Sequence, residues 1–241
     1  MNTGQVVDHS ARVPSDVLRL AERLGATPDS SGRVVRLTQA GSMRDDPERR
    51  FMSFTAKQTI ATDRTAFAWR ARVGPLGFIT VVDAFENDAP KLDVRVLGWL
   101  QLASVRGEPA AGKGEIMRYL AELPWAPDAI LANRHLVWRV VDGQTFRVSC
   151  RSGSVRGEVE FKLNGHGCVG EVFAPDRPRK EGALFVERPW RGRFFDYREH
   201  LGRWLPFRGE VGWDIDGQTF VAWRGVLRSW DCISVPGERF D

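Results

Sequence analysis

The chain has 241 residues, of which 42% are hydrophobic and 27% are charged, and its formal net charge is +4. This is the composition of an ordinary folded domain, and it excludes a disordered or fibrous protein. The most apolar stretch, residues 94–103, contains Arg95 and Gln101 and is too short to cross a bilayer. We therefore expect no membrane span.

The N-terminal residues contain no apolar stretch of the kind found in a secretory signal. We predict a flexible arm over residues 1–13, then a single domain over residues 14–241, in a cytoplasmic protein. A short helix is expected to open the domain, with Ser15 as its N-cap and Gly25 at its end. Its apolar face consists of Val17, Leu18, Leu20, Ala21 and Leu24.

After a polar link over residues 26–32, the apolar residues follow the alternation typical of β-strands. Tight-turn pairs such as Asp142-Gly143, Asn164-Gly165 and Asp216-Gly217 separate the alternating segments. Short strands joined by such turns predict an antiparallel meander of about ten to twelve strands.

One helix is expected in the middle of the chain, from Lys113 to Leu123. A single helix beside a large twisted sheet predicts a mainly β fold, in which a strongly curved antiparallel sheet, a half-barrel, wraps around the helix. The N-terminal helix would pack outside. The polar side of the central helix carries Glu115, Arg118, Tyr119 and Glu122.

The charged residues of this helix face can form pairs. Arg118 lies three residues after Glu115 and four before Glu122, so it can pair with either carboxylate. If the sheet wraps the helix, this face looks into a pocket or is covered by residues 190–198. We then expect loss of Arg118 to destabilise the protein.

Residues 107–114 have the G-x-x-x-x-G-K spacing of a phosphate-binding loop. Gly114 replaces the Ser or Thr that would hold magnesium, and no parallel βαβ unit surrounds the segment. We interpret it as a flexible loop between a strand and the helix, without a nucleotide.

No pattern indicates a metal, a cofactor or a covalent nucleophile. His166 and Cys168 could supply two metal ligands, but no second pair is near them in the sequence. The cysteines are scattered and form no C-x-x-C pair, and no G-x-S-x-G motif occurs.

Asp83 shares one face of a predicted strand, Phe78 to Glu86, with apolar neighbours. A carboxylate on an apolar face must be paired or must have a raised pKa. It is either a structural residue, bonded to backbone or to an arginine, or a ligand anchor or general base.

Residues 176–199 combine many arginines with aromatic residues, a pattern that can bind nucleic acid or an anionic head group. Acidic residues offset much of this charge, so we interpret the segment as solvated and ion-paired and expect no nucleic-acid partner. The nine tryptophans of the chain are either core residues or the lining of a cavity for a flat or apolar ligand.

Three blocks of sequence, together with shorter ones between residues 15 and 230, resemble an uncharacterised bacterial family of unknown function. The blocks are Phe54-Thr-Ala-Lys-Gln58, Gly114 to Pro127, and Pro189-Trp190 to Arg198. The resemblance implies a fold similar to the half-barrel of the lipoprotein carriers. That fold serves carriers of hydrophobic ligands and at least one cofactor-free enzyme, so it does not decide the function.

Relatives in this family often carry a membrane segment before the domain, whereas residues 1–13 are not apolar. On this ground we expect no membrane role. No pattern predicts the oligomeric state.

The first hypothesis for the function is binding of an apolar or amphipathic small molecule in a tryptophan-lined cavity between sheet and helix. The alternative is a cofactor-independent acid–base enzyme that performs a cyclisation, condensation or isomerisation, with Asp83, Glu115 or Glu122 transferring the proton. Arg118 or Arg198 would then hold an anion. A purely structural or interaction domain is the third hypothesis. The predicted ligand-binding residues are Trp69, Asp83, Glu115, Arg118, Tyr119, Glu122, Trp190, Tyr197 and Arg198.

Overall fold

The computed structural model describes residues 13–28, 32–97 and 100–234. The arm predicted over residues 1–13 lies almost entirely outside this part of the chain. The described strands are β1 (Arg33–Met43), β2 (Met52–Ala61), β3 (Phe67–Val73), β4 (Ile79–Glu86), β5 (Ala89–Val96), β6 (Leu100–Arg106), β7 (Val137–Val140), β8 (Thr145–Ser152), β9 (Val155–Leu163), β10 (Val169–Glu181), β11 (Leu184–His200), β12 (Arg203–Ile215) and β13 (Gln218–Ser234).

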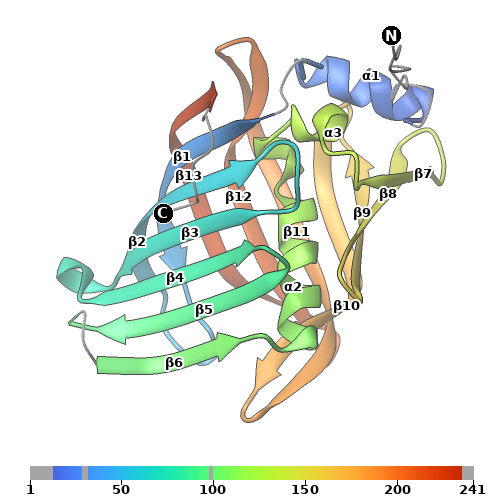
Figure 1. Cartoon of the computed structure of the whole chain (residues 1–241). Coiled ribbons are helices and arrows are strands. Elements are labelled where there is room, and N and C mark those ends of the chain that lie inside the picture. The colour runs from blue at the N-terminus through green and yellow to red at the C-terminus, as the bar shows by residue number, and fades with distance from the viewer. Residues whose placement is uncertain (1–12, 29–31, 98–99, 235–241) are drawn as a thin grey trace, which may run out of the picture.

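These strands form one curled antiparallel sheet (Figure 1). Its order is β6-β5-β4-β3-β2-β1-β13-β12-β11-β10-β9-β8-β7. Because β1 pairs with β13, the first and last strands lie side by side in the middle, and two meanders extend from them to the two edges. The predicted curved antiparallel sheet around a helix is confirmed, with thirteen strands among the described residues instead of ten to twelve.

The two edge strands, β6 and β7, are consecutive in the chain and are joined by a helical segment. This segment contains α2 (Pro109–Ala121), the short helix η3 (Leu123–Trp125) and α3 (Ala129–Ala132). Because it must reach from one edge of the sheet to the other, α2 lies inside the curl (Figure 1). It packs against β8, β9 and β10 on one side and against β4 and β5 on the other.

The structure corrects the predicted start of this helix. It begins at Pro109, so residues 109–114 are its first turns and not a flexible loop. Proline suits the first helical position, where its missing N–H would have no partner. The helix ends at Ala121 instead of Leu123.

The N-terminal helix is confirmed as α1 (Ser15–Arg23), but Ser15 does not cap it. Ser15 is already helical, the N-cap position belongs to Pro14, and no side chain caps the helix. The carbonyl oxygen of Pro14 accepts the backbone N–H groups of Val17 and Leu18 at 2.9 and 3.0 Å. At the other end Gly25 has a φ of +75°, which a glycine adopts without strain.

Two apolar clusters fill the inside of the sheet. The larger one joins α1 and α2 to the inner faces of β1–β4 and β7–β13 and includes the fully buried Phe67, Ile116 and Phe161. The smaller one lies on the inner faces of β2 and β3 and consists of Phe54, Ala56, Trp69, Ala71 and Val73.

Gly157 of β9 marks a close approach of α2 to the sheet, because a Cβ atom there would lie 2.7 Å from Cγ2 of Ile116. We predict that Gly157→Ala lowers the free energy of unfolding by roughly 1–3 kcal/mol through overpacking. Gly112 of α2 is the control, since its added Cβ would lie 3.8 Å from Val155, an ordinary contact.

Gly112→Ala is expected to raise the free energy of unfolding by up to about 1 kcal/mol, because alanine favours the helix over glycine. Urea unfolding of both variants measures these changes. Equal stabilities would contradict the close packing of α2 on β9.

Candidate functional site

A row of three side chains crosses the inner face of the sheet below α2. Gln58 of β2 lies opposite Trp69 of β3, and Trp69 lies opposite Asp83 of β4. Residues directly opposite one another on neighbouring strands point to the same face. The antiparallel register therefore collects an amide, an indole and a carboxylate from three strands beneath the helix.

Arg118 of α2 meets this row. Its Nη1 donates a hydrogen bond to Oδ2 of Asp83, and its Nε donates to Oε1 of Glu122 at 3.0 Å. Nε2 of Gln58 donates to Oε2 of Glu122. Only 17% of the Arg118 side chain, 16% of Asp83 and 11% of Glu122 is exposed. The predicted pairing of Arg118 with Glu122 is present, and Asp83 is its second partner.

Aromatic rings enclose the same guanidinium group. Its central carbon lies 4.8 Å from the ring centroid of Phe67 and 5.3 Å from that of Trp69. A cation over the face of an aromatic ring is attracted by the ring's quadrupole. Burial alone would lower the pKa of Arg118, but its attraction to Glu122, Asp83 and Glu115 outweighs this and raises it. Arg118 is therefore charged in the folded protein.

Glu115 lies one turn before Arg118 on the helix and faces a second arginine, Arg177 of β10. The pairing of β10 with β11 shifts in register between Ala174 and Arg177. Such an irregularity changes the face of the sheet to which the following side chains point. The Arg177 guanidinium lies 4.6 Å from the ring centroid of Trp190. Burial lowers the pKa of Arg177.

The carboxyl group of Glu115 has a strongly raised pKa. Burial and then repulsion by Asp83 raise its pKa from the ordinary 4.5 to about 8, although Arg118 and Arg177 oppose the shift. Burial also raises the pKa of Glu122, against the effect of Arg118. Near pH 7 Glu115 is therefore mostly protonated.

Several atoms of this group have unused hydrogen-bonding capacity. Oδ1 of Asp83, Oε2 of Glu115, Oε1 of Gln58 and Nε of Arg177 are buried and form no hydrogen bond with a described residue. Buried polar atoms in proteins are almost always paired. We call Gln58, Asp83, Glu115, Arg118, Glu122 and Arg177 the helix-face cluster.

Three of the other predicted site residues lie in the core around the cluster. The Tyr119 side chain is fully buried, donates to the carbonyl oxygen of Ala61 at 3.2 Å and accepts from Asn133 at 2.9 Å. Trp69 is 4% exposed and donates to Gln39 at 3.2 Å, and Trp190 is equally buried beside Arg177.

Tyr197 and Arg198 belong to another part of the molecule. The Tyr197 hydroxyl donates to the carbonyl oxygen of Val169 at 2.8 Å, and its side chain borders a separate hollow of about 690 Å³. Arg198 is exposed and pairs with Asp196 at 2.6 Å. His166 and Cys168 border the same hollow as Tyr197. In the part of the chain that the structure describes, no three metal-ligating side chains are grouped to hold an ion.

Sequence patterns missed Gln58, Arg177 and Phe67. The alternation of β2 places Gln58 between the buried Ala56 and Ile60, so an amide on an apolar strand face was the available signal. For Arg177 the available signal was Pro175, because a proline inside a strand often marks a bulge, and the irregularity of β10 lies between Ala174 and Arg177.

A family model described as "Family of unknown function (DUF6544)" matches residues 6–225. The chain belongs to this family. The family resemblance of the sequence blocks is thereby confirmed. A search of curated proteins finds no match to this DUF6544 chain.

The solved structures similar to this DUF6544 protein include a LolA superfamily protein from Nitrosomonas europaea, with a TM-score of 0.49 and 10% identity over 91% of this chain and 94% of the other. A putative outer membrane lipoprotein-sorting protein domain from Vibrio parahaemolyticus has the same score and identity over 93% of each chain. A DUF1329 family protein from Desulfovibrio piger has a TM-score of 0.45 at 10% identity, covering 93% of this chain and 92% of the other. None of the helices in the described residues is long and apolar enough to cross a membrane.

Arg118→Ala should expose the electrostatic role of the cluster. Removing the cation leaves buried carboxylates without their partner, which costs about 3 kcal/mol and lowers Tm by roughly 6–12 °C at neutral pH. The pKa of Glu122, already raised, would rise further without the cation, so part of the loss should be recovered near about pH 5, where more of this carboxylate is protonated.

Arg147→Ala is the matched control for this variant, because Arg147 forms a 2.9 Å pair with Glu160 in which 41% and 31% of the side chains are exposed. Such an exposed pair contributes only about 0–1 kcal/mol. Thermal melts at both pH values measure the effects. Equal melting of the two variants would show that the Arg118 pairs are solvated.

Glu115→Gln should change how stability depends on pH. In the folded wild type the pKa of Glu115 is about 8, above its ordinary 4.5, so the neutral carboxyl group stabilises the folded state. This contribution is fully present below about pH 4.5 and is lost as the pH rises through 8. Glutamine stays neutral, so the variant should gain stability relative to the wild type across this window. Urea unfolding measures it, with Glu160→Gln as the control. A difference that does not change with pH would contradict the raised pKa.

Proposed function

We propose that this DUF6544 protein binds an amphipathic small molecule inside the curl of its sheet. The polar end of the molecule would meet the helix-face cluster, and the apolar part would lie along the inner face of β4 and β5. The observation that carries this proposal is the meeting of two features. A buried charged group has unpartnered atoms, and directly beside it lies an apolar wall that the core leaves partly exposed.

The apolar wall follows from the register. Val81 of β4 lies opposite Ala71 of β3 and Val94 of β5, and Ile79 lies opposite Val73. Ala71 and Val73 are buried, whereas Ile79, Val81 and Val94 are only partly buried. An apolar body placed on them would remove more apolar surface from water, which favours binding by about 25 cal/mol per Å².

The polar end favours a group that donates hydrogen bonds. The unpartnered Oδ1 of Asp83 and Oε1 of Gln58 are acceptors, the protonated Glu115 can accept or donate, and Arg177 offers one unpartnered N–H. A hydroxyl or amino group on the ligand would satisfy such acceptors, which are costly when left unpaired. The tryptophans contribute less than the sequence suggested: Trp69 and Trp190, both almost completely buried, support the cluster from within the core.

A second candidate function is favoured by Glu115 alone. A carboxyl group with a pKa near 8 beside Asp83 is suited to give and take a proton, as in a cofactor-independent acid–base enzyme. Mass spectrometry of a co-purified ligand distinguishes the two functions. A ligand that the wild type converts and that Glu115→Gln binds unchanged supports an enzyme, whereas an unchanged ligand in both supports a binding protein.

We also propose that the protein works in a reducing compartment such as the cytoplasm. Cys150, Cys168 and Cys232 are free thiols, and the first two are buried. Proteins of oxidising compartments more often pair their cysteines.

The binding proposal is tested with N-phenylnaphthylamine, an uncharged apolar dye with one N–H donor. We predict saturable binding that Val81→Trp weakens by about tenfold or more, because the larger ring fills the space along the wall. Val82→Trp is the matched control, since Val82 is similarly exposed on the opposite face of β4. Dye fluorescence measures both affinities. No uptake by the wild type, or equal loss in both variants, would contradict the proposal.

A further inference from the structure

Large apolar side chains are exposed at one end of the sheet. The turns after β1, β3 and β5 lie at the same end of the sheet. Each is flanked by two residues that lie opposite each other, namely Met43–Met52, Val73–Ile79 and Val96–Leu100. The β3–β4 turn contains the short helix η2 (Pro75–Gly77). Exposed there are Met52 (39%), Leu76 (88%), Phe78 (50%), Leu97 (58%) and Leu100 (47%), which we call the apolar tip.

Two residues of the apolar tip have an unfavourable backbone conformation for their type. Leu76 has a φ of +59° and Leu97 a φ of +53°. Glycine and asparagine adopt this left-handed region more readily than leucine does. Exposed leucines at these positions therefore stabilise neither the turn nor the core, which points to a role for their side chains in contact with another surface.

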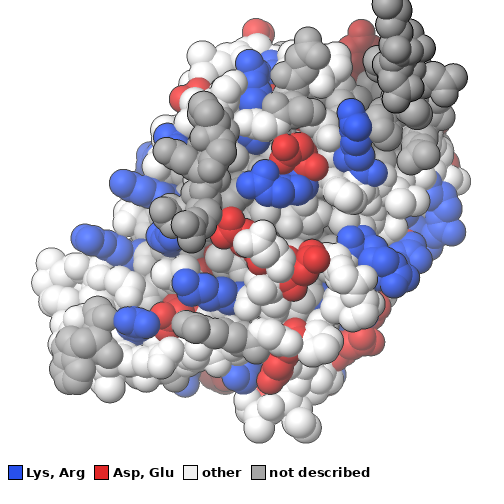
Figure 2. All heavy atoms as spheres, in the orientation of Figure 1, with Lys and Arg blue, Asp and Glu red and all other residues white. Residues whose placement is uncertain are grey.

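The outer face of the strands that lead to the tip is basic. A hollow of about 1850 Å³ over β1–β4 and β13 is bordered by Arg36, Lys57, Arg70, Arg72 and Arg228. All five are exposed, and none forms an ion pair with a residue in the described part of the chain. Figure 2 shows Lys and Arg side chains spread over the wing formed by β2–β6, with some Asp and Glu side chains between them.

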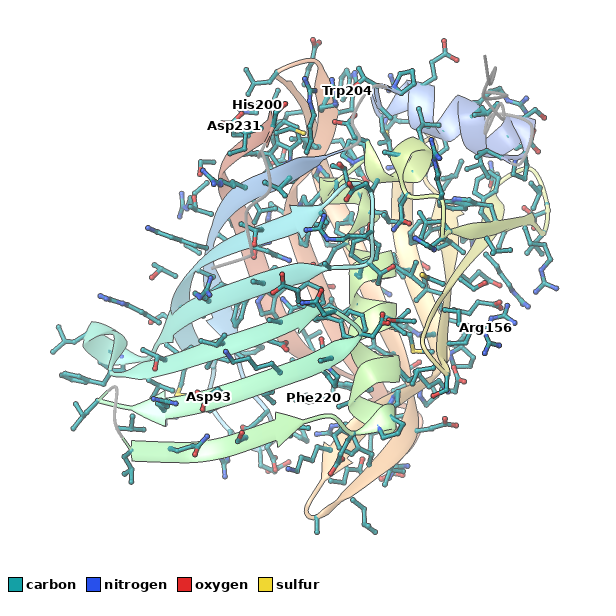
Figure 3. The ribbon with its side chains drawn as sticks, viewed as in Figure 1. Asp93, Arg156, His200, Trp204, Phe220 and Asp231 are labelled. Atoms are coloured by element: carbon teal, nitrogen blue, oxygen red, sulfur yellow. The ribbon has the colours of Figure 1, made fainter. Side chains whose placement is uncertain are left out.

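The arrangement of these cations is unfavourable in the isolated protein. Lys57 and Arg70 are directly opposite each other on β2 and β3, where like charges repel. The acidic residues Asp93 and Asp231 on this face do not lie opposite Lys57 or Arg70. Asp93 is bound to Arg95 and Gln101, and Asp231, toward the far end of the face (Figure 3), lies opposite Arg36 and offsets that cation. An anionic surface would relieve the repulsion.

The basic face and the apolar tip are continuous. Arg72 lies at the end of β3, and a Cβ atom on Gly77 of the tip turn would be only 3.0 Å from its Cβ. Arginine beside exposed leucine and phenylalanine is the combination found on protein surfaces that lie in the interface of an anionic bilayer.

We propose that this end of the sheet docks on a bilayer containing anionic lipids, with the apolar tip inserted among the head groups and the basic face held by their phosphates. Such peripheral contact needs no spanning segment, so it is compatible with the finding that no helix of the described residues could span a membrane. Nucleic acid is the less suitable anion, because the hollow offers no exposed aromatic ring for stacking among the described residues.

The test is co-sedimentation with vesicles of phosphatidylcholine mixed with phosphatidylglycerol, compared with vesicles of phosphatidylcholine alone. The wild type should bind the mixed vesicles, and added salt should weaken binding. Leu76→Asn combined with Leu97→Asn should weaken it by about tenfold or more, while asparagine suits the backbone of both turns. Lys57→Gln with Arg70→Gln should weaken it by roughly tenfold.

Leu201→Asn is the matched control. Leu201 is 65% exposed with a φ of +49°, but it lies in the β11–β12 turn beside Gly25, at the opposite end of the strands. This variant should bind like the wild type. No binding of the wild type to mixed vesicles would overturn the proposal. So would equal loss in the Leu201 and Leu76/Leu97 variants, or binding to duplex DNA without binding to vesicles. No ligand is needed, so the result is independent of the function proposed for the inner face.

Discussion

The pairing of Arg118 with Asp83 and Glu122 allows a charged helix to lie inside a curled sheet. The segment from β6 to β7 connects the two edges of that sheet, and α2 crosses its inside with the polar side largely removed from water. A buried charge without a partner costs several kcal/mol, whereas one surrounded by carboxylates and aromatic rings is tolerated. The position of α2, and with it the packing of β4 and β5 against the rest of the molecule, depends on these contacts.

The same contacts shape the candidate site. Arg118 bonds Oδ2 of Asp83 and Oε1 of Glu122, while Oδ1 of Asp83 and Oε2 of the neighbouring Glu115 have no partner. Structure and proposed function therefore draw on one set of residues, and a variant of the cluster is expected to change both stability and binding. Residues of the apolar wall, such as Val81, lie outside the cluster, so variants there would test the proposed binding apart from the Arg118 pairs.

Much of the fold could be predicted from local patterns. Alternation and tight turns identify the strands, and the apolar stripe of Ile116, Met117 and Leu120 identifies the inner helix. Other features depend on contacts far apart in the sequence. The sequence near Pro109 is compatible both with the first turn of a helix and with a glycine-rich loop. Packing of the helix on β9 decides between them. Asp128, fully buried and bound to Arg203 at 3.0 Å, has no periodic signal at all.

The site shows the same division. Helical spacing was enough to place Glu115, Arg118 and Glu122 together, and the strand face singled out Asp83. That Asp83 is the partner of Arg118 required the three-dimensional structure, because 35 residues separate them. Tyr119 lies within the same helical sector, yet its ring enters the core, since a hydrogen bond from Asn133 and the carbonyl of Ala61 satisfy its hydroxyl. Tyr197 and Arg198 were grouped with the helix because residues 190–198 were expected to cover its polar face, whereas their side chains bond to Val169 and Asp196.

A double-mutant cycle between the helix and the sheet tests the central claim most directly. Arg118→Met, Asp83→Leu and the double variant would be compared with the wild type in urea unfolding at neutral pH. If Arg118 and Asp83 pair in a desolvated place, the two substitutions should be coupled by about 1–3 kcal/mol, with the double variant more stable than the sum of the single losses predicts. Additive effects, within about 0.3–0.5 kcal/mol, would contradict a charged helix face buried against β4.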